Sequence, residues 1–301
     1  MNTIDAFEKD IYLQLRLLEN FIPQKPLAES VQKRTIFCGT GDSMASAMLA
    51  ESFSDCRARA LDPLDAIKNK NLLKGKRVYF VSISGNTISN IRAAKLVKDS
   101  TAITRNDSSR LAMTCKNVIR LDYDDSQILT SGSIGFASSM LACISLVCKF
   151  RIQNTKNLFE SAKRQSNILL KNKVYVLGNQ FTYPLAMYAA AKMFEVLGTD
   201  AHYERLEQFS HMGVFSAKKG DTVIIFEEKN AHNKLLVSNL KNLGLRVYQP
   251  QTNQKSKINH VIFYMFVSQL AALNNAKRKH LSDCHFVTSK KIRKASSDMI
   301  Y

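Results

Sequence analysis

The segment Ser82-Ile-Ser-Gly-Asn-Thr87 places three hydroxyl side chains, those of Ser82, Ser84 and Thr87, within six residues. It follows an apolar run that is typical of a buried strand and precedes apolar residues at helical spacing. A strand that enters a helix through such a turn brings hydroxyls and unpaired backbone N–H groups together, which suits an anion such as phosphate. Gly85 would let the backbone approach that anion closely. A capped helix that binds no ligand is the alternative.

The second half of the chain contains ionisable residues of types that can transfer protons. Lys192 and Glu195 are three residues apart in an apolar helical stretch, and His211 lies further along the chain. A carboxylate and a histidine can take up and return protons, and a lysine can stabilise developing negative charge. The alternatives are a surface ion pair between Lys192 and Glu195 and a loop histidine at position 211.

Apolar runs predict strands that alternate with helices in both halves of the chain. Such alternation predicts parallel sheets with helices on both faces, and ligands bind beyond the carboxyl ends of the strands. The fold class is therefore α/β, with two tandem three-layer α/β/α domains, each around a mostly parallel five-stranded sheet. The predicted parts are an N-terminal helix in residues 1–29, a first domain in 30–150, a linker helix in 151–170, a second domain in 171–275 and a basic tail in 276–301.

The two predicted domains differ at the turn where phosphate would bind. The first has the hydroxyl turn and, after an earlier strand, the turn Gly39-Thr-Gly with Thr40 at the same sheet edge. The second has Phe226-Glu-Glu-Lys-Asn230, whose carboxylates would repel phosphate. We therefore expect a single phosphate site, in the first domain.

The composition excludes several classes of protein. The chain is 45% hydrophobic and 23% charged, has no long apolar run and no apparent secretory signal, and its six cysteines lack paired spacing, so we expect a reduced, cytoplasmic globular protein. The net charge of +18 favours anionic partners, but without a nucleic-acid-binding motif we expect a phosphorylated small molecule. Gly-x-Gly-x-x-Gly is absent, which argues against a nicotinamide cofactor. We expect no cofactor, metal or membrane partner.

The motifs together resemble the sugar isomerase (SIS) domain family, in particular the isomerase half of glucosamine-6-phosphate synthase. Cys38-Gly-Thr-Gly is similar to the family turn Cys-Gly-Thr-Ser, Ser82–Thr87 to its loop Ser-Gln-Ser-Gly-Glu-Thr, and Gly135-Phe-Ala-Ser-Ser139 to its turn Gly-Val-Ala-Ser-Thr. The resemblance implies that phosphate and sugar are bound by Thr40, Ser82, Ser84, Gly85, Asn86, Thr87 and Ser138.

The same resemblance implies roles for the second half. Lys192-Met-Phe-Glu195 is similar to the family segment Lys-Leu-Lys-Glu, which makes Glu195 the base, Lys192 a supporting charge and His211 the ring-opening residue. Arg293-Lys-Ala-Ser296 resembles a tail whose lysine, here Lys294, closes over the sugar. In the family the histidine comes from a neighbouring subunit, which implies a homodimer.

The implied function is a phosphosugar aldose–ketose isomerase for a hexose 6-phosphate or amino-hexose 6-phosphate, without a glutaminase domain. A family segment Ala-Gly-Thr-Glu reads Ser131-Gly-Ser-Ile here, with Ser133 or no residue in place of the glutamate, so the substrate stays open. Asn86 is closer to archaeal-type phosphoglucose/phosphomannose isomerases. That activity and glucosamine-6-phosphate deamination are the alternatives among enzymes. A non-catalytic sugar-phosphate-binding regulator is the alternative of another class.

Overall fold

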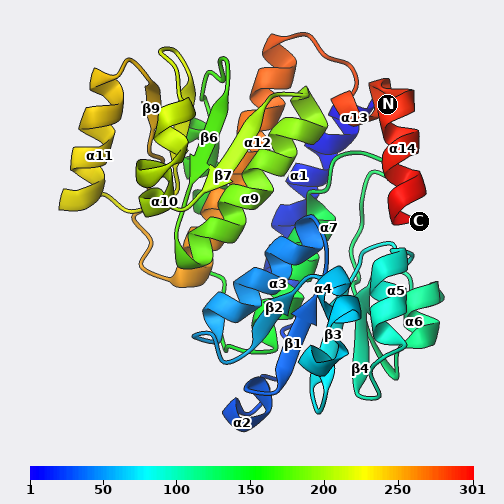
Figure 1. The fold of residues 1–301 in the computed structure, drawn as a ribbon. Helices are drawn as coiled ribbons and strands as arrows, with labels where there is room; N and C mark the ends of the chain where they lie inside the picture. The colour runs from blue at the N-terminus through cyan, green and yellow to red at the C-terminus, as the bar shows by residue number, and fades with distance from the viewer. The chain divides into compact units, whose positions relative to one another are not determined.

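A computed structural model describes all residues, 1–301, as alternating strands and helices (Figure 1). Every pair of neighbouring strands is parallel, in a five-stranded and a four-stranded sheet. The chain forms two compact units. Unit 1 consists of Met1–Glu19, Asp125–Ser131 and Arg151–Ser289, and unit 2 of Asn20–Asp124, Gly132–Phe150 and Lys290–Tyr301. Each unit thus takes segments from distant parts of the sequence.

Unit 2 is built on the five-stranded sheet, with strand order β2-β1-β3-β4-β5. Its strands are β1 (Thr35–Cys38), β2 (Arg59–Leu61), β3 (Arg77–Val81), β4 (Ser100–Thr104) and β5 (Asn117–Arg120). Its helices are α2 (Glu29–Gln32), α3 (Asp42–Phe53), α4 (Pro63–Lys68), the 3₁₀ turn η1 (Lys70–Leu73), α5 (Ile88–Ala94), α6 (Arg110–Thr114), α7 (Ile134–Ser145) and α14 (Lys290–Ile300). All five strands lie where apolar runs predict them.

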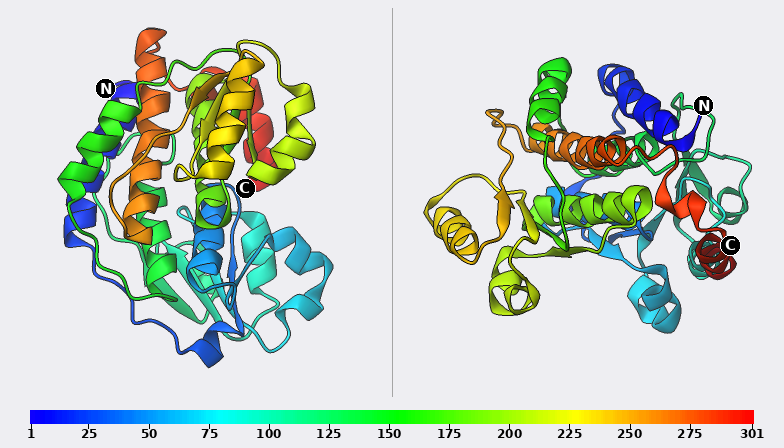
Figure 2. Two further views of the ribbon diagram at one scale, coloured as in Figure 1. Left: turned by 90° about the vertical axis from the view of Figure 1, so that its left-hand side faces the viewer. Right: turned by 90° about the horizontal axis from the view of Figure 1, so that it is seen from above.

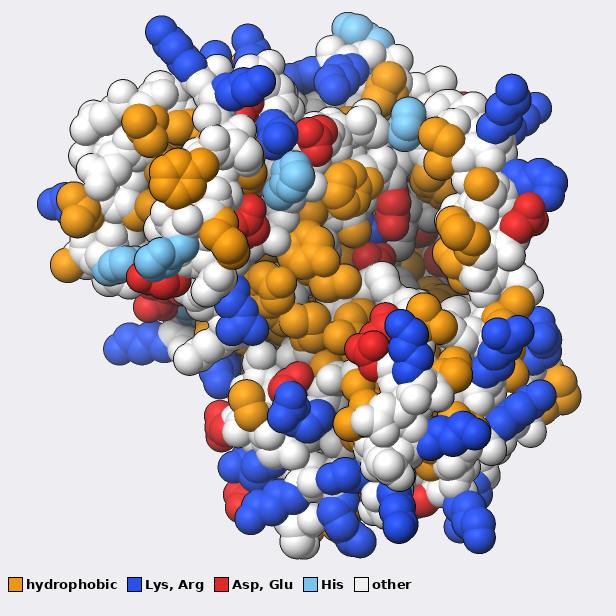
Figure 3. Space-filling view, viewed as in Figure 1, with side chains coloured by type: hydrophobic (Ala, Val, Ile, Leu, Met, Phe, Trp, Pro, Cys, Tyr) orange, Lys and Arg blue, Asp and Glu red, His pale blue; other side chains and the backbone are white.

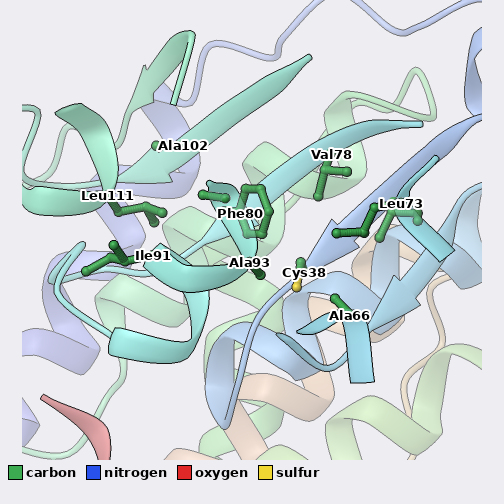
Figure 4. Packing of buried hydrophobic residues seen from close by; sticks show 11 residues of the cluster. Cys38, Ala66, Leu73, Val78, Phe80, Ile91, Ala93, Ala102 and Leu111 are labelled. Atoms are coloured by element: carbon green, nitrogen blue, oxygen red, sulfur yellow. The ribbon is translucent and has the colours of Figure 1, made fainter. Parts of the chain in front are cut away.

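Alternation along the strands gives this sheet two buried faces. Val78 and Phe80 of β3 project with Cys38 of β1 into a core formed with α4, α5 and α6 (Figure 4). Phe37 and Tyr79 point to the opposite face and stack with ring centroids 5.2 Å apart. Helices α3 and α7 pack together and contact the strands of the sheet. Unit 2 is therefore a three-layer α/β/α structure.

Unit 1 is built on the four-stranded sheet, with strand order β7-β6-β8-β9. Its strands are β6 (Val174–Leu177), β7 (Ala201–Glu204), β8 (Thr222–Ile225) and β9 (Arg246–Tyr248). Its helical segments are α1 (Thr3–Asn20), α8 (Thr155–Gln165), η2 (Gln180–Thr182), α9 (Tyr183–Lys192), η3 (Met193–Leu197), α10 (Leu206–His211), η4 (Gly213–Ser216), α11 (Ala231–Asn242), α12 (Lys257–Arg278) and α13 (His285–Thr288). The prediction of five strands for this sheet is wrong, because after β9 the chain passes through Pro250 directly to the 22-residue helix α12.

Helices cover both faces of the second sheet as well. Tyr175 and Leu177 of β6 pack with apolar residues of α10 and α11. On the other face Phe226 stacks on Tyr264 of α12, with ring centroids 4.7 Å apart. Helices α9 and α12 lie side by side in the view from above (Figure 2, right). No helix in the structure combines the length and apolarity that crossing a membrane requires.

Two helices of unit 2, α7 and α14, carry predicted site residues. Helix α7 begins at Ile134, so it contains the segment Gly135–Ser139 with Ser138. A small serine fits where α7 packs against α3, because the buried hydroxyl oxygen of Ser139 lies 3.0 Å from that of Ser46. The basic tail contains two short helices, α13 and α14, although its exposed polar residues give no strong apolar signal.

Candidate active site

The hydroxyl turn lies between β3 and α5 in unit 2. The hydroxyl oxygens of Ser82 and Thr87 are buried and 3.3 Å apart, whereas Ser84 is exposed and accepts a 3.3 Å hydrogen bond from the backbone N–H of Asn86. Thr87 occupies the N-cap position of α5, but no side chain caps the helix. The backbone N–H groups of Thr87, Ile88 and Ser89 have no hydrogen-bond partner within the protein. The turn therefore presents hydroxyls and free amide donors together.

Gly85 is required by the protein's own packing. Its φ of +65° is in the left-handed region, and a Cβ there would lie 2.0 Å from Oγ of Ser109 and 3.0 Å from Oγ1 of Thr104. Its carbonyl accepts a 2.9 Å hydrogen bond from the N–H of Leu111. The expected reason, close approach to an anion, is thus unnecessary to explain this glycine.

Two further segments of unit 2 adjoin the turn. Because the strand register pairs Cys38 with Phe80, the turn that carries Thr40 leaves the sheet beside the hydroxyl turn. The start of α7 also lies against it, since a Cβ on Gly135 would come within 3.5 Å of the Ile83 side chain. Close by, the buried hydroxyl of Ser133, at the N-cap of α7, has no hydrogen-bond partner in the protein.

Glu195 is held by two donors in unit 1. Nζ of Lys192 and Oγ of Ser131 each lie 2.6 Å from the same carboxylate oxygen, Oε2. The Oε1 atom has no hydrogen-bond partner in the protein, and 37% of the side chain is exposed. Lys192 is fully buried, with Nζ 4.9 Å from the ring centroid of Tyr188. The alternative of a surface ion pair is therefore wrong.

The local backbone contributes to this arrangement. Glu195 lies in η3, one turn of π-helix that continues α9, and such turns are frequent at functional sites. The wider turn changes the direction of its side chains relative to those of α9. Ser131 is the residue that sequence reasoning missed as a partner of Glu195, because 64 positions separate the two and no local pattern links them.

His211 ends α10, and its side chain is 72% exposed. Its Nε2 lies 3.7 Å from Oε1 of Glu207, and no contact joins it to Glu195. A cavity of about 470 Å³ lies beside it and is lined by Tyr183, Tyr203, Glu204, Arg205, Gln208, Met212 and Gly213. Burial raises the pKa of the Glu204 carboxyl, because a poorly solvated carboxylate is disfavoured.

Lys294 lies in α14, which belongs to unit 2, and its Nζ is 2.7 Å from Oδ2 of Asp298. Its side chain is exposed, which fits an ordinary solvated pair one helical turn apart. Predicted site residues are thus brought together in two places, and His211 and Lys294 belong to neither group. Unit 2 brings Thr40 and the hydroxyl turn together, and unit 1 brings Lys192 and Glu195 together with Ser131.

Glu227 makes a contact that the sequence did not suggest. Its Oε1 accepts hydrogen bonds from the backbone N–H of Asn179, at 2.8 Å, and from Oγ1 of Thr182, at 2.6 Å. These donors lie in the turn after β6, and Glu227 follows the neighbouring strand β8. A carboxylate of the protein therefore occupies the donors at this edge of the second sheet.

Comparison with known proteins finds one similarity in sequence, to part of a longer protein. No family model matches the sequence. The sequence is 25% identical over 283 residues to a glutamine–fructose-6-phosphate aminotransferase (isomerizing) of Sulfurisphaera tokodaii, in a match that covers 85% of this chain and 46% of that protein. The chain thus spans about half the length of this relative.

Solved structures share the fold at low sequence identity. Glucosamine-6-phosphate deaminase from Thermotoga maritima has a TM-score of 0.76 and 17% identity, with 93% of this chain and 95% of that chain covered. The C-terminal domain of glucosamine-fructose-6-phosphate aminotransferase from Francisella tularensis has a TM-score of 0.68 and 14% identity, with 91% and 96% covered. Tagatose-6-phosphate ketose/aldose isomerase from Escherichia coli has a TM-score of 0.66 and 15% identity, with 92% and 90% covered. The predicted resemblance to the sugar isomerase (SIS) proteins is confirmed: the chain has the fold of phosphosugar isomerases and is similar in sequence to part of an isomerizing aminotransferase.

Proposed function

We propose that the chain is an aldose–ketose isomerase of a hexose 6-phosphate or amino-hexose 6-phosphate, built from two SIS domains. The observation that carries the proposal is the Glu195 carboxylate, whose Oε2 is fixed by Lys192 and Ser131 while Oε1 is free. A base held in this way can accept a proton without first breaking a hydrogen bond at the accepting oxygen. A protein that only binds a sugar phosphate would not need such a base.

Substrate binding rests on the hydroxyl turn. The hydroxyls of Ser82, Ser84 and Thr87, with the free N–H groups at the start of α5, would bind the phosphate oxygens. Gly85 and Asn86 would shape the turn around the phosphate, and Thr40 would add a donor from the neighbouring turn. Ser133, with its unpartnered buried hydroxyl, and Ser138 would bind the sugar from the side of α7.

The isomerisation needs an open-chain sugar and a base. His211 would move the proton between the ring oxygen and the C1 hydroxyl during ring opening. Oε1 of Glu195 would then take the proton from C2, leaving an enediolate, and return it to C1, while the proton of the O2 hydroxyl passes to O1 and the ketose forms. The Lys192 ammonium would stabilise the charge at this step, and Lys294 would add charge from the tail.

We propose further that two copies of the chain share the active site. His211 is exposed and lies among exposed apolar side chains, with Met212 62% and Phe215 85% exposed. Apolar side chains of this size are costly to leave in water, so a second copy covering this region would stabilise it. That copy would receive His211 near its own Glu195.

A deaminase is the second candidate. It is favoured by the similarity of the fold to glucosamine-6-phosphate deaminase, which has a TM-score of 0.76. Both reactions move a proton between C1 and C2, so Glu195 would have the same role, and the release of ammonia separates the two.

The first experiment is hydrogen exchange in D₂O, observed by proton NMR. The purified chain is incubated with fructose, glucose, mannose and glucosamine 6-phosphates in turn. Deuterium at C1 or C2 that is absent with Glu195→Gln supports isomerisation and identifies the sugar, and ammonia from glucosamine 6-phosphate identifies a deaminase. Phosphate-dependent binding without exchange of any sugar would contradict the isomerase and favour a regulator.

Mixed dimers test the shared site. If His211 acts in the partner copy, mixing Glu195→Gln with His211→Ala protein creates one complete site per mixed dimer. The activity should then return to about a quarter of that of the unsubstituted dimer after random mixing, and to about a half if all dimers are mixed. The measurement is kcat after exchange of subunits, with unmixed variants as controls. Verified mixed dimers without recovery would place both residues in one chain's site.

A further inference from the structure

A second concave site lies in unit 2, away from the hydroxyl turn. A cavity of about 530 Å³ is lined by six lysine and arginine side chains and a single carboxylate. The charged residues are Arg34, Lys70, Lys74, Lys76, Arg77, Lys98 and Asp99. Lysine and arginine side chains also crowd the lower margin of unit 2 in Figure 3.

The cavity lies at the edge of the sheet opposite to the hydroxyl turn. Arg34 immediately precedes β1, Arg77 begins β3 and Asp99 immediately precedes β4, so the cavity lies at the amino ends of three parallel strands. Helix α5 separates the two sites, since its first residue follows the hydroxyl turn and Leu96 and Val97, beyond its last residue, line the cavity. The cavity is therefore distinct from the proposed phosphate site.

Most of the positive charge in this cavity is not neutralised by the protein. Asp99 accepts a 2.9 Å hydrogen bond from Nε of Arg77, and Nζ of Lys76 lies 3.5 Å from the carbonyl of Lys33. The side chains of the other four cationic residues form no hydrogen bond or ion pair. All four side chains are exposed, so water and salt screen their mutual repulsion, and a bound anion would find them without an ion-pair partner in the protein.

Shape and lining define the class of anion. The hollow has the volume of a small-molecule site, and Val31, Leu73, Leu96 and Val97 contribute apolar surface beside the charges. Four free cations exceed what one phosphate group needs, and the apolar side chains suit a ring. We propose that this cavity binds a small organic polyphosphate, such as a nucleoside diphosphate, with the phosphates on the lysines and the ring on the apolar wall.

Fluorescence titration with N-methylanthraniloyl ADP tests the proposal. The full chain carries Ser84→Ala and Thr87→Val throughout, so that the hydroxyl turn cannot account for binding. We expect saturable binding, competition by ADP and inorganic pyrophosphate, and at least about tenfold weaker competition by AMP, which has one phosphate group fewer. Absence of saturable binding, or equal competition by AMP, would overturn the proposal.

Matched triple variants locate the site. Lys70→Gln with Lys74→Gln and Lys98→Gln should weaken binding about tenfold or more. Lys171→Gln with Lys234→Gln and Lys241→Gln removes the same charge from exposed positions of unit 1 and should leave affinity within about twofold. Equal loss in both triples would show attraction by net charge only and overturn the proposal.

Two more measurements test whether ADP binds in the cavity and whether a nucleic acid binds there instead. Hydrogen–deuterium exchange of the chain with the cavity lysines intact should show protection by ADP in residues 70–77 and 96–99, which tests the site even if the cavity variant does not fold. A 20-nucleotide single-stranded RNA should have an association constant that, divided by its number of phosphate groups, does not exceed the corresponding value for ADP. Binding of that RNA more than about 100-fold tighter than ADP, lost in the cavity variant, would replace a small ligand with a nucleic acid and overturn the proposal.

Discussion

The turns after β3 and after β8 occupy equivalent positions in the two sheets, since each strand pairs with the first strand of its own sheet. After β3 the turn carries hydroxyls whose hydrogen bonds stay within the turn, beside N–H groups at the start of α5 that have no hydrogen-bond partner in the protein. After β8 the Glu227 carboxylate binds the Asn179 N–H and the Thr182 hydroxyl of the adjacent turn. The same edge of the same kind of sheet thus keeps unpaired N–H donors in unit 2 and is occupied by an internal carboxylate in unit 1.

This difference suggests how the two units divide their work. In the proposed enzyme, unit 2 binds phosphate, and unit 1, where the protein's own carboxylate fills the corresponding edge, supplies the base. The comparison can be tested by substitutions on each side of it.

The largest effect is expected for the base in unit 1. Glu195→Gln keeps the side-chain shape and its contacts with Ser131 and Lys192 nearly unchanged but cannot accept a proton. We expect kcat to fall about 10²- to 10⁴-fold with little change in KM. Steady-state kinetics on the sugar identified by NMR measures it, with exposed Glu160→Gln of α8 as control. Near-normal turnover would remove Glu195 as the base.

A smaller effect is expected in the open turn of unit 2. Thr87→Val removes one hydroxyl from the phosphate and should raise KM about 10- to 150-fold, the equivalent of about 1.5–3 kcal/mol for a hydrogen bond to a charged group. Thr182→Val is the matched change in unit 1, where the hydroxyl already binds Glu227, and should leave KM unchanged. A similar rise in KM for both variants would contradict the division between the units.

The internal carboxylate can be removed to see whether its turn then binds an anion. Glu227→Ala removes the acceptor that the Asn179 N–H and the Thr182 hydroxyl share, so that these two residues keep only their hydrogen bonds to each other, and it should lower the free energy of unfolding by about 1–3 kcal/mol. Thermal unfolding is measured with and without phosphate in the Ser84→Ala/Thr87→Val background. Phosphate should recover part of the loss in Glu227→Ala but not in Glu227→Gln, which keeps an acceptor oxygen. No recovery would mean that the fold around this turn cannot hold an external anion.

The smallest effect concerns Glu204, which ends the edge strand β7 and lies against Gly213. Burial raises its folded-state pKa above the ordinary value, so the folded protein is favoured when this group is protonated, and that stability is lost as the pH rises through the folded pKa. Glu204→Gln removes this dependence, and the variant should gain stability relative to the parent between pH 4 and pH 7, by less than about 1 kcal/mol. Chemical denaturation of the parent and the variant at both pH values measures this gain. An equal difference in their free energies of unfolding at the two pH values would show that Glu204 is as well solvated in the folded chain as in the unfolded one.

The sequence by itself determined the features that depend on neighbouring residues. Apolar runs located the central strands such as β3 and β8, because a strand buried on both faces needs a continuous apolar stretch, whereas the strands at the sheet edges contain fewer apolar residues and are partly exposed. The hydroxyl turn and the pairing of Lys192 with Glu195 could also be predicted, since each lies within one short segment. The four-strand second sheet departed from the expectation because a repeat in sequence does not guarantee an equal number of strands.

Only the tertiary structure decided what meets across long separations. Ser131 contacts Glu195 from 64 positions away, and Glu227 reaches Asn179 from 48 positions away, through loops whose paths no local pattern specifies. The cationic cavity arises because three strands begin at the same sheet edge and bring lysines from separate loops around one hollow. Burial of Lys192 likewise depends on packing around its helix, so charge and spacing alone could not distinguish it from a surface lysine.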